Sequence, residues 1–415
     1  MGERVGRGYS LDFWKANLMN LLTMTGQAVF FLLTLYFLNN GLDRREVGVC
    51  DGTFWLVSVL IQPWLGRQLD RVGRKPFFVY GTVLMAVASV GYLTLPTHLL
   101  LMIPLRALHG VGFSCFFTAS WTWVSDQAPP HRMAEMLGVF GVSGLLAGAM
   151  GPVLGEQLKE RYSFVLAFQV ALALILAGSL MAAWVHEAPF QQTKAQRRGI
   201  GFFKLAATLR MRGLTLASLA MGITIGSVFA FVAPYVAEKH IHGVGYIFVL
   251  YTVAAVATRL FAGQVTGRLG AVGVISLALG MNAVALVAFR HLTTSGWTGL
   301  PLMLGTGAGA GLAYGLIYPA LGALAVERSG TQRGVGMSVV ACFGDLGSSL
   351  GAAAAGVVAH YLDYARMWFC VGIVVAGIAL LFLLMEAQWR ARRRRRPKES
   401  EGPPLRLVPR ENRLG

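Results

Sequence analysis

Four charged side chains lie within or beside the long apolar stretches of this chain, and they are the residues most able to do chemistry. They are Asp51, Arg106, Arg259 and Asp345. Placing a charge inside a membrane span costs at least about 2.5 kcal/mol, so such residues usually serve a function. A low-dielectric site disfavours the ionised form of a carboxyl, which helps it to bind and release protons. We therefore predict that Asp345 is a proton carrier; the alternatives are an ion pair, for example with Arg259, or a hydrogen bond between helices.

For the other three charged residues the sequence indicates a less specific role. Asp51, near the outer end of its predicted span, is either a second proton site or a side chain hydrated at the membrane surface. Arg106 could tune the proton affinity of a nearby acid or hold an anionic group of a solute. Arg259 is grouped with Asp345 and Asp51 as a proton-coupling residue.

Polar and aromatic stripes at helical spacing form a second set of candidates. Asn20, Thr23 and Gln27 recur at i, i+3 and i+7, which places them on one face of a helix. Amides and hydroxyls are costly against lipid, so these side chains should face a cavity or another helix. The predicted solute-binding residues are Asn20, Thr23, Gln27, Arg106, Phe113, Phe117, Trp121, Thr224, Phe231, Tyr235, Tyr314 and Tyr318. This aromatic, weakly polar set suits an organic, partly apolar solute; helix packing is the alternative for each residue.

The composition places all these residues in a membrane. The chain is 55% hydrophobic and 13% charged, with a mean hydropathy of +0.59, whereas soluble domains carry about 25% charged residues. A helix needs about 20 apolar residues to cross a bilayer. We predict an all-α polytopic membrane protein with twelve transmembrane helices. The expected spans are 13–38, 46–66, 76–97, 100–124, 135–157, 163–185, 213–236, 244–265, 271–291, 298–324, 334–360 and 366–387.

A polar stretch in the middle of the chain divides the spans into two groups of six. The predicted parts are an N-terminal six-helix bundle over 1–190, a cytoplasmic linker over 191–212, a C-terminal six-helix bundle over 213–389 and a basic tail over 390–415. Basic residues gather in the loops of one side, so both termini are expected to be cytoplasmic. Directly after a span, the tail should lie against anionic lipid rather than bind nucleic acid.

The loop at 66–75 reads Gly-Arg-Gln-Leu-Asp-Arg-Val-Gly-Arg-Lys and resembles the loop 2–3 signature of the major facilitator superfamily. The matching positions are Gly66, Asp70, Arg71, Gly73, Arg74 and Lys75. The resemblance implies a cytoplasmic gate in which the aspartate meets the start of span 11 and Arg74 links Asp70 to Asp126. The alternative is that these charges only fix the topology.

An internal repeat supports the same resemblance. An offset of 197 residues aligns Gly66 with Gly263, Arg71 with Arg268 and Gly73 with Gly270. In this superfamily two such six-span repeats form pseudo-symmetric bundles with the substrate site between them, and spans 1, 4, 7 and 10 line that site. The fifth span resembles a glycine-proline signature that is associated with antiporters. Its matching residues are Gly148, Gly151, Pro152 and Gly155; the alternative reason for these glycines is close helix packing.

The resemblance implies a secondary active transporter that works by alternating access, as a monomer in a prokaryotic inner membrane. Segments 125–135 and 318–334 resemble the efflux branches, those of drug or metabolite:proton antiporters. We therefore expect proton-coupled export of a small organic, partly apolar compound. The alternatives are a proton-coupled uptake symporter and a membrane sensor that does not transport. The sequence offers no nucleophile–base pair, phosphate loop or metal-ligand cluster, so we expect neither an enzyme nor a cofactor or metal.

Overall fold

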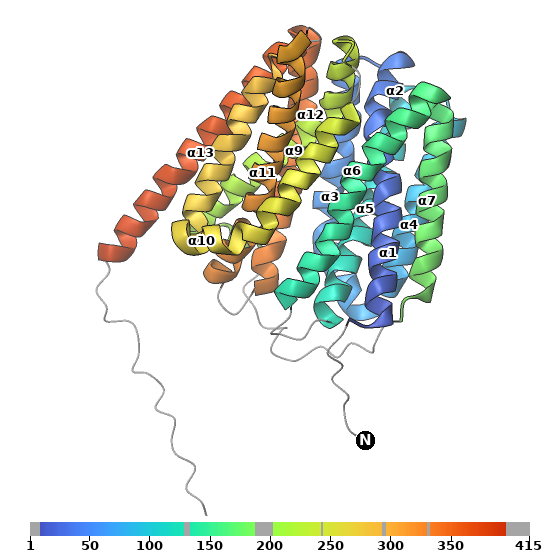
Figure 1. Cartoon of the computed structure of the whole chain (residues 1–415). Helices are drawn as coiled ribbons and strands as arrows, with labels where there is room; N and C mark the ends of the chain where they lie inside the picture. The colour runs from blue at the N-terminus through green and yellow to red at the C-terminus, as the bar shows by residue number, and fades with distance from the viewer. Residues whose placement is uncertain are drawn as a thin grey trace, which may run out of the picture.

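The computed structural model describes residues 9–127, 133–186, 202–241, 244–292, 296–329 and 333–395, and these are almost entirely helical (Figure 1). The helices are α1 (Leu11–Val29), η1 (Phe30–Leu32), α2 (Leu33–Asn39), α3 (Arg44–Val72), α4 (Lys75–Thr94), α5 (Leu99–Gln127), α6 (Met133–Arg161), α7 (Phe164–Trp184), α8 (Phe202–Ala206), α9 (Leu209–Glu238), α10 (Val244–Phe289), α11 (Gly296–Ser329), α12 (Arg333–Tyr361) and α13 (Tyr364–Arg395). Ten segments of this part of the chain are long and apolar enough to cross a membrane, and Ile247–Arg259 is a shorter apolar segment. The predicted all-α polytopic fold is confirmed.

Side-chain caps fix where several helices begin. Ser10 accepts a hydrogen bond from the backbone N–H of Phe13 at 3.1 Å, at the start of α1. Asp43 and Glu46 form a reciprocal capping box at the start of α3, with both N···O distances at 2.8 Å. Because such caps satisfy N–H groups that have no partner within the helix, the short polar connections can end one helix and start the next.

The helix α10 contains two predicted spans, because it turns at Gly270. The φ angle of Gly270 is +70°, a conformation that residues with a Cβ rarely adopt. Gly73, its counterpart at the offset of 197 residues, also has a positive φ, of +100°, between α3 and α4. The repeat in the sequence therefore places two glycine turns at equivalent points of the two halves.

Helices α1 to α7 form one half of the molecule and α9 to α13 the other, as the colours of Figure 1 show. We call the end where α1 begins and α13 finishes the near end, and the opposite end the far end. At the far end Arg44 of α3 pairs with Glu238 of α9, and a Cβ on Gly48 would stand 2.7 Å from the Ala352 carbonyl oxygen of α12. The two halves are therefore in close contact at the far end.

Some predicted features lie outside the described residues. These are the linker residues 191–201, the part of the basic tail from 396 to 415, and the side chains of Gly66, Asp70 and Arg71 in the predicted gate. The described part of the linker includes the short helix α8, and α13 extends the last span to Arg395.

Candidate functional site

Asp345 lies at the middle of α12, half-buried, where the two halves meet. The hydroxyl of Ser58, on α3 of the other half, donates a hydrogen bond to Asp345 Oδ2 at 2.6 Å. Ser58 itself is 2% exposed. Among the described residues no cation pairs with Asp345. The carboxyl therefore has one bond that crosses the interface and no fixed counter-charge in the described part of the chain.

Arg259, in the part of α10 that precedes the turn at Gly270, also points across the interface. Its guanidinium carbon is 5.8 Å from the ring centroids of both Tyr314 and Tyr318 on α11, within the range of a cation–π contact. Its Nη1 lies 3.2 Å from the point that a Cβ on Gly141 of α6 would occupy. Its Nε is buried, and no described residue accepts a hydrogen bond from it. The ion pair with Asp345 that the sequence left open is not found in the described ranges.

Rows of aromatic side chains, which we call aromatic ladders, run along equivalent helices of the two halves. On α5 the ring centroids of Phe113 and Phe117 are 5.4 Å apart, and those of Phe117 and Trp121 are 5.8 Å apart. On α11 the rings of Tyr314 and Tyr318 are 6.1 Å apart. The repeat offset aligns Phe117 with Tyr314 and Trp121 with Tyr318. These five predicted residues therefore form two related aromatic ladders.

The same offset aligns Arg259 with Gln62. Gln62 donates a hydrogen bond from Nε2 to the hydroxyl of Thr118 on α5 at 3.1 Å. The position that corresponds to Thr118 is Gly315, which has no side chain to accept such a bond. Gln62 thus has a hydrogen-bond partner within its own half, whereas the Nε of Arg259 at the equivalent position has no partner among the described residues.

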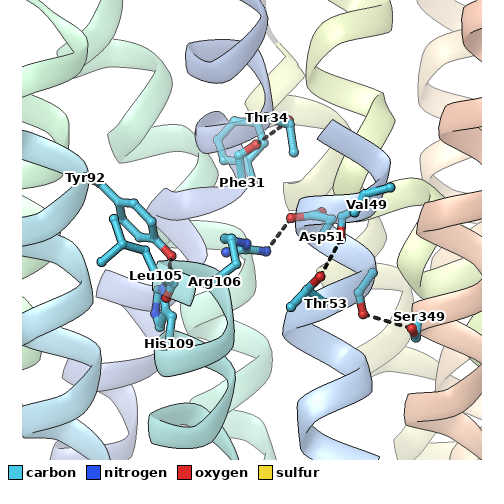
Figure 2. A network of polar contacts seen from close by, with 11 residues as sticks. Phe31, Thr34, Val49, Asp51, Thr53, Tyr92, Leu105, Arg106, His109 and Ser349 are labelled. Atoms are coloured by element: carbon cyan, nitrogen blue, oxygen red, sulfur yellow. Dashed lines mark hydrogen bonds and ion pairs between the residues drawn. The ribbon is translucent and has the colours of Figure 1, made fainter. Parts of the chain in front are cut away.

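Arg106 and Asp51 neutralise each other inside the first half. Figure 2 shows the guanidinium of Arg106 on α5 directed at the carboxylate of Asp51 on α3. The two side chains are 6% and 8% exposed, and the guanidinium carbon also lies 4.6 Å from the ring centroid of Phe54. This geometry favours a structural role for two residues that the sequence offers as binding and proton-coupling candidates.

The polar stripe of α1 lies mostly between helices. Asn20 donates from Nδ2 to the Ser143 hydroxyl of α6 at 2.8 Å. Thr23 is fully buried against α7, where a Cβ on Gly178 would stand 2.1 Å from the Thr23 hydroxyl. Gln27 is half-buried, and its Oε1 has no hydrogen-bond partner in the described ranges. Asn20 and Thr23 therefore contact neighbouring helices of their own half.

The predicted binding residues of α9 also differ in their surroundings: one lines a cavity and two pack between helices. Thr224 lines a cavity of about 40 Å³ inside the second half, together with Tyr251, Asn282, Tyr314 and apolar side chains. Phe231 is fully buried beside Tyr364 of α13, with ring centroids 6.1 Å apart. Tyr235, also fully buried, donates its hydroxyl hydrogen to the Phe289 carbonyl at 2.8 Å. Both aromatic residues pack inside the second half.

At the near end Arg74 connects three helices of the first half. Its Nε lies 2.8 Å from Asp126 Oδ2 at the end of α5, and its Nη1 donates to the Leu69 carbonyl of α3 at 2.6 Å. Arg74 is itself the residue that precedes α4. The contact between Arg74 and Asp126 that the sequence resemblance implies is therefore present.

The glycines of α6 differ in what they contact. A Cβ on Gly151 would stand 2.4 Å from the Ala28 Cβ of α1, and one on Gly155 would stand 3.1 Å from Leu32 Cδ1. For Gly148 no described atom lies within 4 Å of such a Cβ, and Pro152 lies inside the helix. Gly151 and Gly155 thus let α6 approach α1 closely.

Sequence reasoning missed a second ion pair at the near end, in the other half. Arg328 of α11 and Glu386 of α13 are 3% and 4% exposed, with Nη1 and Oε1 2.7 Å apart. Arg328 also donates to the Arg210 carbonyl of α9 at 2.7 Å. Glu386 is the one acidic residue of the last predicted span, 366–387, and this position could have indicated a buried ion pair. Ser58 was also missed, and a single serine in a span carries no comparable signal.

Comparisons with known proteins agree on one family. The sequence model described as Major Facilitator Superfamily matches residues 16–243 and 214–413. The MFS-type transporter YhhS of Escherichia coli (strain K12) is 26% identical over 363 residues, which cover 85% of each chain. The MFS-type transporter STM4428 of Salmonella typhimurium is 24% identical over 82% of this chain and 87% of its own. Two crystal structures of the nucleoside transporter NupG match with TM-scores of 0.76 and 0.75, at 14% and 13% identity, over 90% and 91% of this chain and 99% of theirs.

Proposed function

Because the chain belongs to the major facilitator superfamily, we propose that it is a proton-coupled secondary transporter of a small organic, partly apolar compound. The observation that carries this proposal is the position of Asp345. It is a half-buried carboxyl at the middle of a span, it is bonded across the interface of the halves, and no cation pairs with it among the described residues. A carboxyl held in a fixed ion pair would be much less free to exchange its proton.

The bond between Ser58 and Asp345 links protonation to movement of the halves. The ionised carboxyl gains most from the Ser58 hydroxyl, because a hydrogen bond to a charged acceptor is stronger than one to a neutral acceptor. If the halves separate at this point, an ionised Asp345 loses that bond in a region of low dielectric, which is costly. A protonated Asp345 loses much less. Proton binding therefore lowers the barrier to rearranging the interface.

We assign the contact between Arg74 and Asp126 to a gate at the near end, and we place that end in the cytoplasm of a prokaryotic cell. The start of α1 and the end of α13 share this end (Figure 1), where the arginine-rich segment after Glu386 can meet anionic lipid. A monomer suffices, because one chain supplies both halves of the pathway.

Two directions of transport each have a supporting observation. The close approach of Gly151 and Gly155 to α1 fits the antiporter-associated signature and favours export. Arg259 and Asp345 have no ionic partners among the described residues, and Arg259 lies over the rings of Tyr314 and Tyr318, which favours uptake of an anion together with a proton. Thermodynamically, an inward proton gradient drives export by exchange and uptake by cotransport.

Untargeted mass spectrometry of cells and medium tests the proposal. Cells that express the wild type are compared with cells that express Asp345→Asn. The control is Asp363→Asn, which alters a carboxylate 41% exposed at the start of α13. A compound that collects outside only with the wild type and the control indicates export, and one that is depleted from the medium indicates uptake. Identical pools for wild type and Asp345→Asn would contradict the proposal.

A further inference from the structure

We propose that Arg259 binds the anionic group of an aromatic carboxylate, and that a proton on Asp345 travels with this anion. The inference rests on the proposed function and selects uptake from its two directions. It starts from an arginine that has ring contacts but, among the described residues, no acid beside it.

Arg259 lacks the partners that a guanidinium normally has inside a membrane. Its Nε is buried without a hydrogen-bond acceptor in the described ranges, and its guanidinium carbon faces the rings of Tyr314 and Tyr318 at 5.8 Å. A cation–π contact contributes less than it costs to place a charge within a span. An anion bound at Arg259 would supply the missing counter-charge and the missing acceptor.

The surroundings of Arg259 select the kind of anion. A guanidinium presents a planar fork of N–H donors that matches a carboxylate in a bidentate manner. Tyr314 and Tyr318 flank the fork from one half, and Trp121 reaches the same place from the other half. The Trp121 ring lies 3.3 Å from the point that a Cβ on Gly141 would occupy, and Arg259 Nη1 approaches that point to 3.2 Å. These rings supply the flat faces on which an aromatic carboxylate would stack when its charge meets Arg259.

Charge balance links the anion to the proton. Arg259 and Asp345 both face the interface between the halves, and with Arg259 charged and Asp345 ionised their charges sum to zero. An anion alone would leave a net charge of −1 in a region of low dielectric, and a proton alone would leave +1. Binding both returns the sum to zero, so each ligand favours the other. The site should therefore load one proton with each monovalent anion or remain empty of both.

The groups around Asp345 do not disturb this balance. Tyr318 of α11 and Cys342 on its own helix are titratable side chains near Asp345. Both are ordinarily uncharged at neutral pH. From α3 the hydroxyl of Ser58 faces the carboxyl. In the described parts of α9 and α13, no charged side chain pairs with it.

Binding to the purified protein in detergent tests the inference without any transport. The probes are 4-nitrobenzoate and its neutral isostere 4-nitrobenzamide, which both quench tryptophan fluorescence. The wild type should bind the carboxylate at least about tenfold more tightly than the amide, because hydrogen bonds to charged groups contribute about 1.5–3 kcal/mol. Carboxylate binding should weaken as the pH rises, because an ionised Asp345 repels the anion, whereas amide binding should not.

The variants separate the two residues. Arg259→Gln should lose the preference for the carboxylate, and the fold should accept it because Gln62 occupies the equivalent position. Arg259→Lys should keep part of the preference. Asp345→Asn should keep the preference and lose the pH dependence. The matched control is Arg290→Gln, an exposed arginine 5.3 Å from the Phe369 ring, which should bind like the wild type.

Three results would overturn the inference. They are equal affinity of the wild type for the two probes, no binding of either probe, and a carboxylate preference that persists in Arg259→Gln. A pH-independent affinity of the wild type would overturn the part that concerns the proton. A protein that binds 4-nitrobenzoate as expected and yet moves no compound in cells would contradict the proposed function alone, so the two failures are distinguishable.

Discussion

The two halves of this molecule share one backbone plan, and they differ in how the charges Asp51, Arg106, Arg259 and Asp345 are partnered. In the first half Asp51 and Arg106 form a buried ion pair within the bundle. In the second half Asp345 and Arg259 both point across the interface, and no ion pair involves either in the described residues. This contrast supports our proposal that a charge with a partner in its own half is structural and that Asp345 and Arg259, which have none among the described residues, serve transport.

The charges Asp51, Arg259 and Asp345 within the spans are not part of the internal repeat. The offset of 197 residues aligns Asp345 with Gly148 and Arg259 with Gln62, so neither charge of the second half has a charged counterpart in the first. Asp51 aligns with Phe248 in the same way. The repeated sequence therefore preserves helices, turns and aromatic ladders, but not these charges.

The largest effect should come from breaking the buried pair of the first half. Arg106→Ala leaves Asp51 as an uncompensated buried charge, which typically costs about 3–5 kcal/mol of stability. We expect loss of most folded protein, measured as the folded fraction that survives heating in detergent. Replacing both partners with apolar residues, Asp51→Leu with Arg106→Met, should restore much of the loss. An Arg106→Ala variant as stable as the wild type would contradict a structural role for the pair.

The second half also has a buried ion pair, Arg328 with Glu386 at the near end, which can be compared with the pair of the first half. Arg328→Ala should also cost about 3–5 kcal/mol, because Glu386 is 4% exposed and would keep its charge without a partner. The same heating assay measures it. The control is Arg290→Ala, at an exposed arginine of the same half, which should change stability very little. If Arg328→Ala is equally harmless, the unpaired-charge argument fails for the second half.

The glycines of α6 test whether packing or transport is the main role of the span-5 signature. Gly151→Ala would force a Cβ to within 2.4 Å of the Ala28 Cβ, and such overpacking costs about 1–3 kcal/mol. Gly148→Ala meets no described atom within 4 Å and should be neutral. Equal stability of the two variants in a thermal unfolding assay would exclude the close contact with α1 as the reason for Gly151.

The smallest effect on stability among these substitutions should come from Asp126, the partly exposed acid of the proposed gate. Asp126 is 30% exposed, so Asp126→Asn should cost no more than about 1 kcal/mol. Transport should nevertheless slow, because the contact with Arg74 holds the near ends of α4 and α5 together. The transport rate of Asp126→Asn relative to its folded amount measures this. An unchanged rate would leave the charges with a role in topology alone.

The sequence predicted the scaffold better than the site. Helical spans and the turn at Gly270 follow from hydropathy and the repeat, which are local or periodic signals. A helical stripe defines a face but not its neighbour. Asn20 and Thr23 were expected to face either a cavity or another helix, and they contact α6 and α7. Tyr235, for which helix packing was the alternative to solute contact, packs against its own half.

The sequence also did not predict which side chains pair with the charged residues. Asp51 and Arg106 are 55 residues apart, and a separation of that size says nothing about contact. Ser58 and Asp345 are 287 residues apart and lie in different halves. Which charge is paired depends on how each helix is rotated in the bundle, and that rotation results from the packing of all its neighbours.

The most direct test of the central claim compares two modes of transport in Asp345→Asn. The compound that mass spectrometry identifies would be followed in proteoliposomes, first as exchange without a gradient and then as accumulation driven by an imposed proton gradient. We predict that the variant exchanges the compound at close to the wild-type rate and does not accumulate it, because the pathway is intact and the proton carrier is absent. Proton-driven accumulation by the variant at the wild-type level would contradict the claim that the Asp345 carboxyl couples transport to protons.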